Sequence, residues 1–210
     1  MSVRMQTLVT VSAVLLPACL AVAQMPHLTP FSADMQMTST REHQNMHGKI
    51  YLGGTRMRIE MANPEQESIV INDMANKTTD VLLPPQHMYM EFKGENMLHR
   101  GPDLSDLKPV VDPNNPCSRQ EGSTCKKIGV ETVNGRTCDH WHVTDKNGKA
   151  GDLWIDQKLL FPVRGVDKDT TWNLTNIREG EPSASLFVIP PGYQKMDMGS
   201  MMQRGKPPQQ

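Results

Sequence analysis

The chain has 210 residues, of which 37% are hydrophobic and 21% charged, a composition that suits one globular domain with a buried core. Its 22 basic and 23 acidic residues leave a formal net charge of -1. No overall field favours nucleic acid or an anionic membrane surface, so we expect no nucleic-acid partner, and the oligomeric state stays open.

The first 23 residues have the pattern of a secretory signal peptide. Arg4 precedes an apolar run at 8–16, and Ala21-Val22-Ala23 offers a small-residue cleavage site. The alternative is a lipobox, Leu16-Pro17-Ala18-Cys19, in which Cys19 would carry a lipid anchor. We predict an exported protein, periplasmic or secreted, or alternatively an outer-membrane-anchored lipoprotein. No later apolar run approaches the ~20 residues that a membrane-spanning helix needs.

Residues 24–193 are predicted to form a single antiparallel β domain. Strict alternation at 31–38 indicates a half-buried strand, and the next two strands meet at Gly53-Gly54. In that hairpin we expect Ile50 to oppose Met57. Further strands are expected at 68–72, 78–83 and 87–92. The Pro-containing stretch 94–116 then forms the long connection of the fold.

Three more strands are predicted between Cys125 and Asp156, separated by Asn134-Gly135 and Asn147-Gly148, since Asn-Gly favours tight hairpin turns. In the first of these hairpins we expect Ile128 to oppose Trp141.

For the second hairpin we expect an odd-numbered loop centred on Gly148, which pairs Trp141 with Ile155 and Val143 with Leu153. This register collects the apolar residues on one face, and burial of a whole face outweighs an ideal turn. The histidines of the middle strand then lie on the opposite, polar face.

The remaining strands are expected at 161–167, 170–178 and 185–189, and the Met- and Pro-rich tail at 194–210 is predicted to be disordered. About eleven short antiparallel strands with little helix indicate a mainly β fold. With one apolar face throughout, we predict a strongly curved sheet or unclosed β-barrel.

Five stretches carry a resemblance to a known family: FSADMQMT, GKIYLGGTRMRIEM, GVETVNGRTCDHW, LWID with FPVR, and SLFVIPPGYQK. In order and spacing they are similar to uncharacterised exported bacterial domains, which resemble the LolA/LolB-like superfamily of periplasmic lipoprotein carriers. The similarity extends over residues 31–195. It implies an unclosed β-barrel whose concave apolar face holds acyl chains or a partner segment, with a lipid or lipoprotein as partner. The chain departs from the carriers in having little helix to act as a lid.

The apolar face is the candidate ligand site, and the 16 Met of the chain, against three Trp, supply adaptable apolar volume. The candidate ligand-binding residues are Met35, Met37, Ile50, Met57, Ile59, Trp141 and Ile155. The leading hypothesis is therefore a non-catalytic exported protein that binds an apolar, lipid-like ligand or a partner segment. Phosphate-loop, nucleophile-elbow and H-E-x-x-H motifs are absent from the sequence, so we do not expect an enzyme.

A copper- or zinc-binding protein is the alternative. Cys138, His140 and His142 alternate along one strand, so their side chains project from one face ~6 to 7 Å apart. A thiolate and two imidazoles suit copper or zinc, although the same residues can form an ordinary solvated face. Soft thioethers in the tail could add copper(I) ligands: Met196, Met198, Met201 and Met202.

The mature chain of an exported protein tends to oxidise its thiols, and three cysteines follow the expected cleavage site. We predict a disulfide between Cys117 and Cys125, which closes a short loop, and a free Cys138, which lies too far along the expected hairpin to pair with Cys125.

Overall fold

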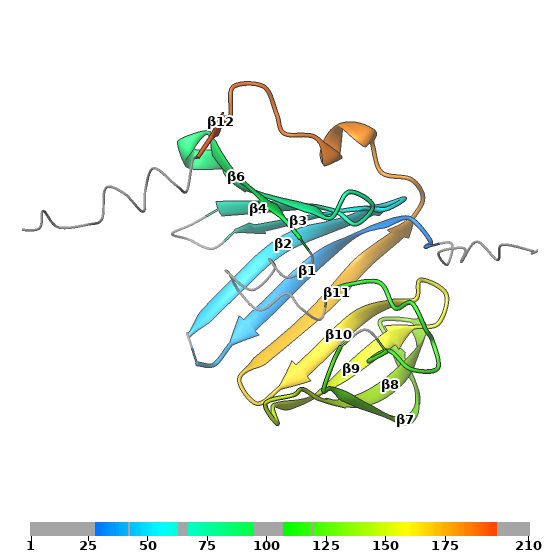
Figure 1. Ribbon diagram of the computed structural model, residues 1–210. Helices are drawn as coiled ribbons and strands as arrows, with labels where there is room; N and C mark the ends of the chain where they lie inside the picture. The colour runs from blue at the N-terminus through cyan, green and yellow to red at the C-terminus, as the bar shows by residue number, and fades with distance from the viewer. Residues whose placement is uncertain (1–27, 42, 63–66, 95–106, 119, 197–210) are drawn as a thin grey trace, which may run out of the picture.

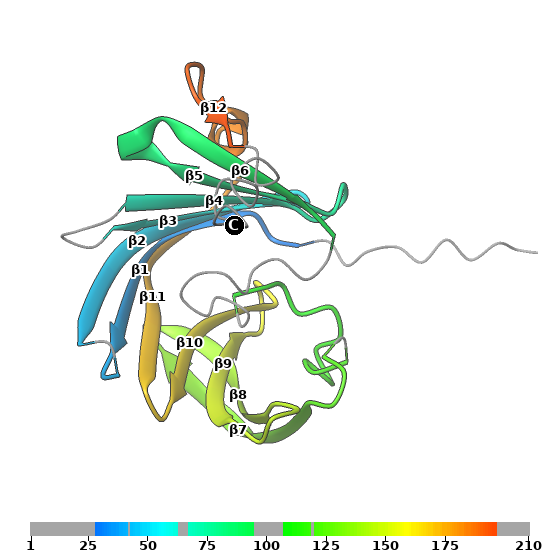
Figure 2. The same ribbon diagram turned by 60° about the vertical axis from the view of Figure 1, so that its left-hand side comes forward.

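The computed structural model describes residues 28–41, 43–62, 67–94, 107–118 and 120–196. These residues form one sheet of twelve strands that bends into an open half-barrel (Figure 1). In Figure 2 the sheet has the outline of a C, with β1–β6 in one arm and β7–β10 in the other. The mainly β, unclosed architecture predicted from the sequence is confirmed.

The strands follow the chain as two meanders joined by the long connection. Their bounds are β1 (Phe31–Ser39), β2 (Gln44–Gly53), β3 (Arg56–Ala62), β4 (Glu67–Asp73), β5 (Thr78–Leu83), β6 (Met88–Lys93), β7 (Thr124–Val133), β8 (Arg136–Thr144), β9 (Ala150–Asp156), β10 (Phe161–Asp167), β11 (Thr170–Glu179) and β12 (Gln194–Lys195). Two short 3-10 helices are η1 (Pro84–Gln86) and η2 (Ala184–Phe187).

The spatial order of the strands is β12-β6-β5-β4-β3-β2-β1-β11-β10-β9-β8-β7. The two meanders therefore meet where β1 pairs with β11, with Met35 opposite Leu174. The sheet also curls at its far end, where the Asn134 amide in the β7–β8 turn donates a hydrogen bond of 2.9 Å to the carbonyl of Leu174 on β11. Strands β7 and β12 form the two edges.

One face of the sheet is apolar from arm to arm. Ile59 on β3 pairs with Ile50 on β2 and with Val70 on β4, while Met37 on β1 pairs with Trp172 on β11. We call this concave face the inner face and the opposite one the outer face. The largest cluster of buried apolar side chains lies here, because period-two alternation in each strand sends every second side chain inward.

The outer face of β3–β6 is covered by the C-terminal segment that follows β11 (Figure 1). Phe187 packs there against Ile69, Ile71 and Leu82. The prediction of a strand at 185–189 is therefore wrong. Its first residues form η2 instead, and the carbonyl of Leu186 accepts a hydrogen bond of 3.0 Å from the Arg58 guanidinium rather than from a neighbouring strand.

The last part of the long connection, residues 107–118, runs along the inner face of the β7–β10 arm (Figure 2). Val110 packs against Trp141 and Ile155, and its N–H donates to the carbonyl of Leu160 at 2.7 Å. Leu107 is buried in the main cluster. This part of the connection therefore fills the inner face at that end of the sheet.

Two predicted hairpins occur with a shifted register. Ile50 pairs with Ile59 rather than Met57, so that the turn falls at Gly54-Thr55. Trp141 pairs with Leu153 rather than Ile155, which makes an odd loop of residues 145–149. Each shift is by two residues, so every side chain keeps its predicted face, as burial requires.

A β-bulge changes the pairing of β7. The register shifts between Lys127 and Gly129, so that Lys127 rather than Ile128 lies opposite Trp141. Ile128 is 53% exposed as a result. The extra residue reverses the alternation on one side of the bulge, so that Lys127 shares the face of Trp141 while Glu131 shares the face of Cys138, and the sequence of this polar strand carries no sign of the change.

The disorder predicted for residues 194–210 is wrong at the first two residues, which form a strand. Gln194 and Lys195 form β12, which pairs with β6 in parallel, while residues 197–210 lie outside the described residues. The signal peptide at 1–23 and the alternative anchor at Cys19 also lie outside them. Within the part of the chain that the structure describes, no helix is long and apolar enough to cross a membrane.

Candidate apolar binding face

The structure divides the predicted ligand residues between two clusters. The five from β1–β3 lie together in the main inner-face cluster: Met35, Met37, Ile50, Met57 and Ile59. Trp141 and Ile155 belong to the separate cluster beneath Val110. All seven side chains are buried, so they form the floor of the inner face rather than an open surface.

A second set of apolar side chains on the same face is only half-buried, and it lies on β5 and β6. Val81 pairs with Met90, Leu83 pairs with Met88, and Phe92 pairs with Thr79. Val81 in turn pairs with Val70, which lies opposite Ile59. The half-buried set therefore continues the inner face outward from the methionine-rich floor.

The ligand-binding residues predicted from the sequence do not include this set. Alternation at 87–92 placed a strand there, but period two alone does not show which alternating face stays partly accessible. The tertiary structure decides this, because the C-terminal segment buries Leu82 on the outer face and leaves Val81 and Leu83 half-buried on the inner one.

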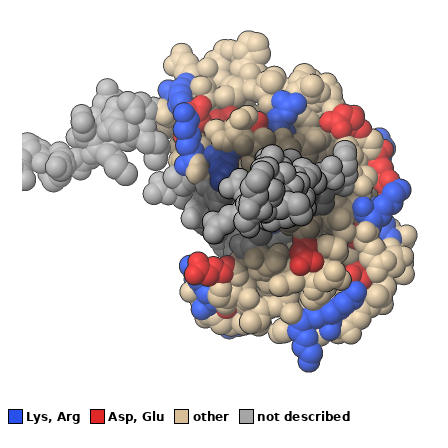
Figure 3. Space-filling view, turned by 45° about the vertical axis from the view of Figure 1, so that its right-hand side comes forward, with Lys and Arg blue, Asp and Glu red and all other residues tan. Residues whose placement is uncertain are grey.

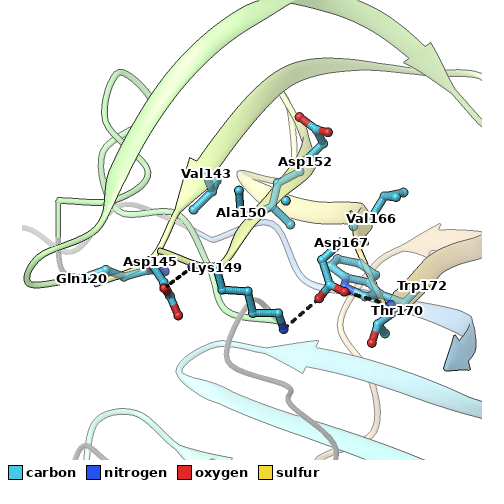
Figure 4. Close-up of a pocket in the computed structure, with 13 residues that line it drawn as sticks. Gln120, Val143, Asp145, Lys149, Ala150, Asp152, Val166, Asp167, Thr170 and Trp172 are labelled. Carbon is cyan, nitrogen blue, oxygen red and sulfur yellow. Dashed lines mark hydrogen bonds and ion pairs between the residues drawn. The ribbon is translucent and has the colours of Figure 1, made fainter. Parts of the chain in front are cut away.

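A pocket of about 100 Å³ opens at the other end of the inner face, between the β8–β9 and β10–β11 turns (Figure 4). Its apolar side is formed by Val143, Leu153, Val166 and Trp172. The polar side includes Gln120, Asp145, Lys149, Asp167 and Thr170. Since Trp172 and Leu153 belong to the main cluster, the pocket is continuous with the methionine-rich floor.

Ionised groups stand on the polar side of this pocket. The backbone N–H of Lys149 donates to Asp145, and this hydrogen bond lowers the pKa of that carboxyl. Burial works to raise the pKa of Asp167, but the Lys149 ammonium at 2.9 Å and two backbone N–H groups hold it below its ordinary value. Both carboxylates are therefore charged at neutral pH.

The predicted metal ligands share the outer face of β8 but have different surroundings. Cys138 is 0% exposed, and burial, reinforced by Asp156, raises the pKa of its thiol to about 11. A protonated thiol is a poor metal ligand. His140 and His142 both turn toward Asp152, with their ring nitrogens 3.3 Å and 3.0 Å from its Oδ1.

The surroundings of His140 are those of a packed surface residue. Its Nδ1 lies 2.7 Å from Glu131, and its ring stacks on Trp154 with centroids 4.3 Å apart. Among the residues that the structure describes, no group of three or more His, Cys, Asp or Glu side chains could hold a metal ion. The copper or zinc alternative stays a prediction without support from this geometry, and three of the four tail methionines lie outside the described residues.

Cys117 and Cys125 form a disulfide, the pairing expected from the sequence, with Cα atoms 5.7 Å apart. It joins the end of the long connection to the start of β7. Cys138 is a free, buried thiol.

Comparison with known proteins places this fold in a family. Residues 31–160 match the family described as Domain of unknown function (DUF4412), and the chain belongs to this family. No curated protein matches the chain in sequence. The family resemblance predicted from the sequence is thereby confirmed.

Several solved structures are similar in fold. An uncharacterized conserved protein from Thermus thermophilus has 13% identity and a TM-score of 0.56, over 81% of this chain and 91% of that one. The MucA/MucB complex of Pseudomonas aeruginosa contains a chain with 14% identity and a TM-score of 0.50, over 78% of this chain and 56% of that one.

A putative outer membrane lipoprotein-sorting protein domain from Vibrio parahaemolyticus is also matched, with 12% identity and a TM-score of 0.39, over 76% of this chain and 89% of that one. At identities this low, the likenesses to the Thermus thermophilus and Pseudomonas aeruginosa structures show the fold alone.

Proposed function

We propose that this protein is a non-catalytic exported binding protein that holds an apolar, lipid-like ligand on the inner face of its half-barrel. The ligand would lie across β4–β6, beside the buried methionine-rich floor of β1–β3. The periplasm or the exterior is the proposed location, with a lipid anchor at Cys19 as the alternative.

The observation that carries this proposal is the half-buried apolar set on β5 and β6. Val81 pairs with Met90 and Leu83 with Met88, Phe92 follows on the same face of β6, and all five remain partly accessible on the inner face. Contiguous accessible apolar surface in a concavity is typical of a ligand site. Covering it would contribute about 0.8 kcal/mol for each buried methylene of an acyl chain.

The outer face of the same strands supports this choice of face. It is already occupied by the C-terminal segment, whose Phe187 and Tyr193 cover β4–β6. A ligand can therefore reach these strands only from the inner side. Methionine side chains there have three rotatable bonds and can repack around chains of different shape.

The charges on the face drawn in Figure 3 give no competing indication of a partner. In Figure 3 Lys and Arg are interspersed with Asp and Glu around the visible face, so that no large patch of one sign appears there. This distribution agrees with a ligand recognised mainly by apolar contact.

The test is ligand binding by Met90→Asp, measured with an apolar fluorescent probe and by native mass spectrometry of protein purified from its own host. We expect lipid to co-purify with the natural sequence, and the probe to bind at least about tenfold more weakly to the variant, because a carboxylate on the inner face would need to be desolvated. Ile128→Asp, at an exposed position of β7, is the matched control and should bind normally. Equal binding by both variants would overturn the proposal, as would a co-purifying peptide in place of lipid.

A further inference from the structure

The indole N–H of Trp172 has no acceptor within the described part of the chain. Trp172 is 4% exposed, and among the described residues no hydrogen bond is made to its Nε1. Trp154, by contrast, donates from Nε1 to Glu131 at 2.8 Å. Nε1 itself is not among the fully enclosed polar atoms without a partner, so water or a ligand can reach it, and the indole N–H of a largely buried tryptophan normally has a partner. Because Trp172 lines the pocket at the end of the inner face, the pocket is where its N–H can meet an acceptor on a ligand.

The indole is held in place by a close approach to β10. A Cβ added to Gly165 would lie 2.4 Å from Nε1 of Trp172, so only glycine leaves room for the ring at this position. Gly165 also pairs with Trp172 across the strands and lines the pocket itself. The unpartnered donor therefore has a defined place in the pocket wall.

The charges at the pocket select the kind of group that can enter. Asp145 and Asp167 carry negative charge, and the ammonium of Lys149, which also lines the pocket, is paired with Asp167 at 2.9 Å. A carboxylate or phosphate would meet a net negative charge, whereas an ammonium cannot accept a hydrogen bond from the indole. Hydroxyl and ester oxygens satisfy both requirements, because hydroxyls can donate to carboxylates and carbonyls can accept from Trp172.

The size and position of the pocket complete the argument. At about 100 Å³ it is smaller than the ~150 Å³ cavity that holds benzene, so it has room for a headgroup but not for a chain. Trp172 pairs directly with Met37, and a chain leaving the pocket would run onto the methionine-rich floor.

Resting on the proposed function, we propose that this pocket binds the uncharged, oxygen-rich headgroup of the ligand, of the glycerol ester kind, with Trp172 as its hydrogen-bond donor. The acyl chain lies along the inner face toward β4–β6.

The experiment compares three probes of equal chain length: a monoacylglycerol, the fatty acid and the alkylammonium. Each displaces an apolar fluorescent dye from the full chain. We expect the monoacylglycerol to bind most tightly, and Trp172→Phe to weaken it about fivefold while leaving the other two unchanged, because this substitution removes one hydrogen bond and keeps an aromatic ring. Trp154→Phe removes an indole N–H from the outer face and is the matched control, with no expected change.

Each outcome separates the two proposals. Equal affinities for the three headgroups, or tighter binding of the fatty acid or the alkylammonium, would overturn the headgroup assignment and leave the apolar binding face intact. If no probe displaces the dye, or the dye itself does not bind, both proposals fail. The order of affinities measured for the natural sequence tests the headgroup assignment even if Trp172→Phe does not fold.

Discussion

At the scale of single residues, the buried polar groups show where the fold depends on individual contacts. Asp156 is almost wholly buried at the end of β9, where it accepts hydrogen bonds from the Arg136 guanidinium and from the backbone N–H groups of Lys158 and Leu159. Arg136 also reaches Glu179 on β11 at 3.0 Å. These contacts fasten the curled end of the sheet, because a buried carboxylate left without hydrogen-bond partners would destabilise the fold.

The thiol of Cys138 makes stability depend on alkaline pH. Its pKa is raised from 9.0 to about 11 by burial, so the folded protein retains the proton that the unfolded chain loses. The corresponding stabilisation is fully present below pH 9 and is lost as pH rises through 11, by on the order of 2 kcal/mol. Urea unfolding at pH 8 and pH ~10.5 should show this loss for the natural sequence and a smaller one for Cys138→Ala. The same pH dependence in both proteins would contradict it.

At the scale of elements, the C-terminal segment acts as a cover for strands that belong to the first meander. Arg58 binds the carbonyl of Leu186, the guanidinium of Arg56 lies 5.2 Å from the centre of the Phe187 ring, and Lys195 pairs with Glu91 at 2.9 Å. The segment thus joins parts of the chain more than a hundred residues apart. Without it, both faces of β4–β6 would present apolar side chains to solvent.

The neighbouring residues Phe187 and Val188 test this role of the segment. Phe187 is buried, whereas Val188 is 52% exposed. We expect Phe187→Ala to lower the free energy of unfolding by about 3 to 5 kcal/mol, through lost burial and the cavity left behind. Val188→Ala should change it by less than about 0.5 kcal/mol. Chemical denaturation measures both, and equal effects would show that the segment does not pack as described.

At the scale of the whole molecule, the half-barrel has one arm whose inner face is filled by its own chain and one arm whose inner face stays partly accessible. Val110 covers Trp141 and Ile155 on the β7–β10 side, while Val81 and Met90 remain half-buried on β5 and β6. The disulfide between Cys117 and Cys125 joins the filling segment to β7. The inner face is therefore divided into a buried floor on β1–β3, a pocket at the β8–β9 and β10–β11 turns, and the half-buried set on β5 and β6.

The disulfide should contribute to stability by restricting the unfolded chain. Replacing both partners, Cys117→Ser with Cys125→Ser, is expected to cost about 2 to 3 kcal/mol in urea unfolding. Because Val110 would be held less firmly over Trp141, the tryptophan emission of the folded variant should also shift. Treating the natural sequence with reductant should reproduce both effects and leave the variant unchanged. An unaltered unfolding midpoint after complete reduction would contradict the prediction.

Apolar alternation was enough to predict the mainly β fold, the strands of both meanders and the inward side of most of them, although Ile128 on β7 was expected on the buried face and is exposed. Side chains alternate with period two whatever the tertiary structure, so Met35 and Ile59 could be assigned to the buried face from their spacing alone. The same reasoning could not distinguish registers that differ by two residues, because such shifts leave every face unchanged. Trp141 was for this reason placed opposite Ile155 instead of Leu153.

Only the tertiary structure decided which part of the apolar face is floor and which is accessible. Residues distant in sequence determine it: Val110 covers Trp141, Phe187 covers Leu82, and neither contact leaves a trace in local periodicity. The pocket likewise combines two turns with Trp172 and Gly165, whose close approach depends on strand pairing. Burial depends on which residues are neighbours in space. Alternation along the chain shows only which face of a strand is apolar, and not which segment covers that face.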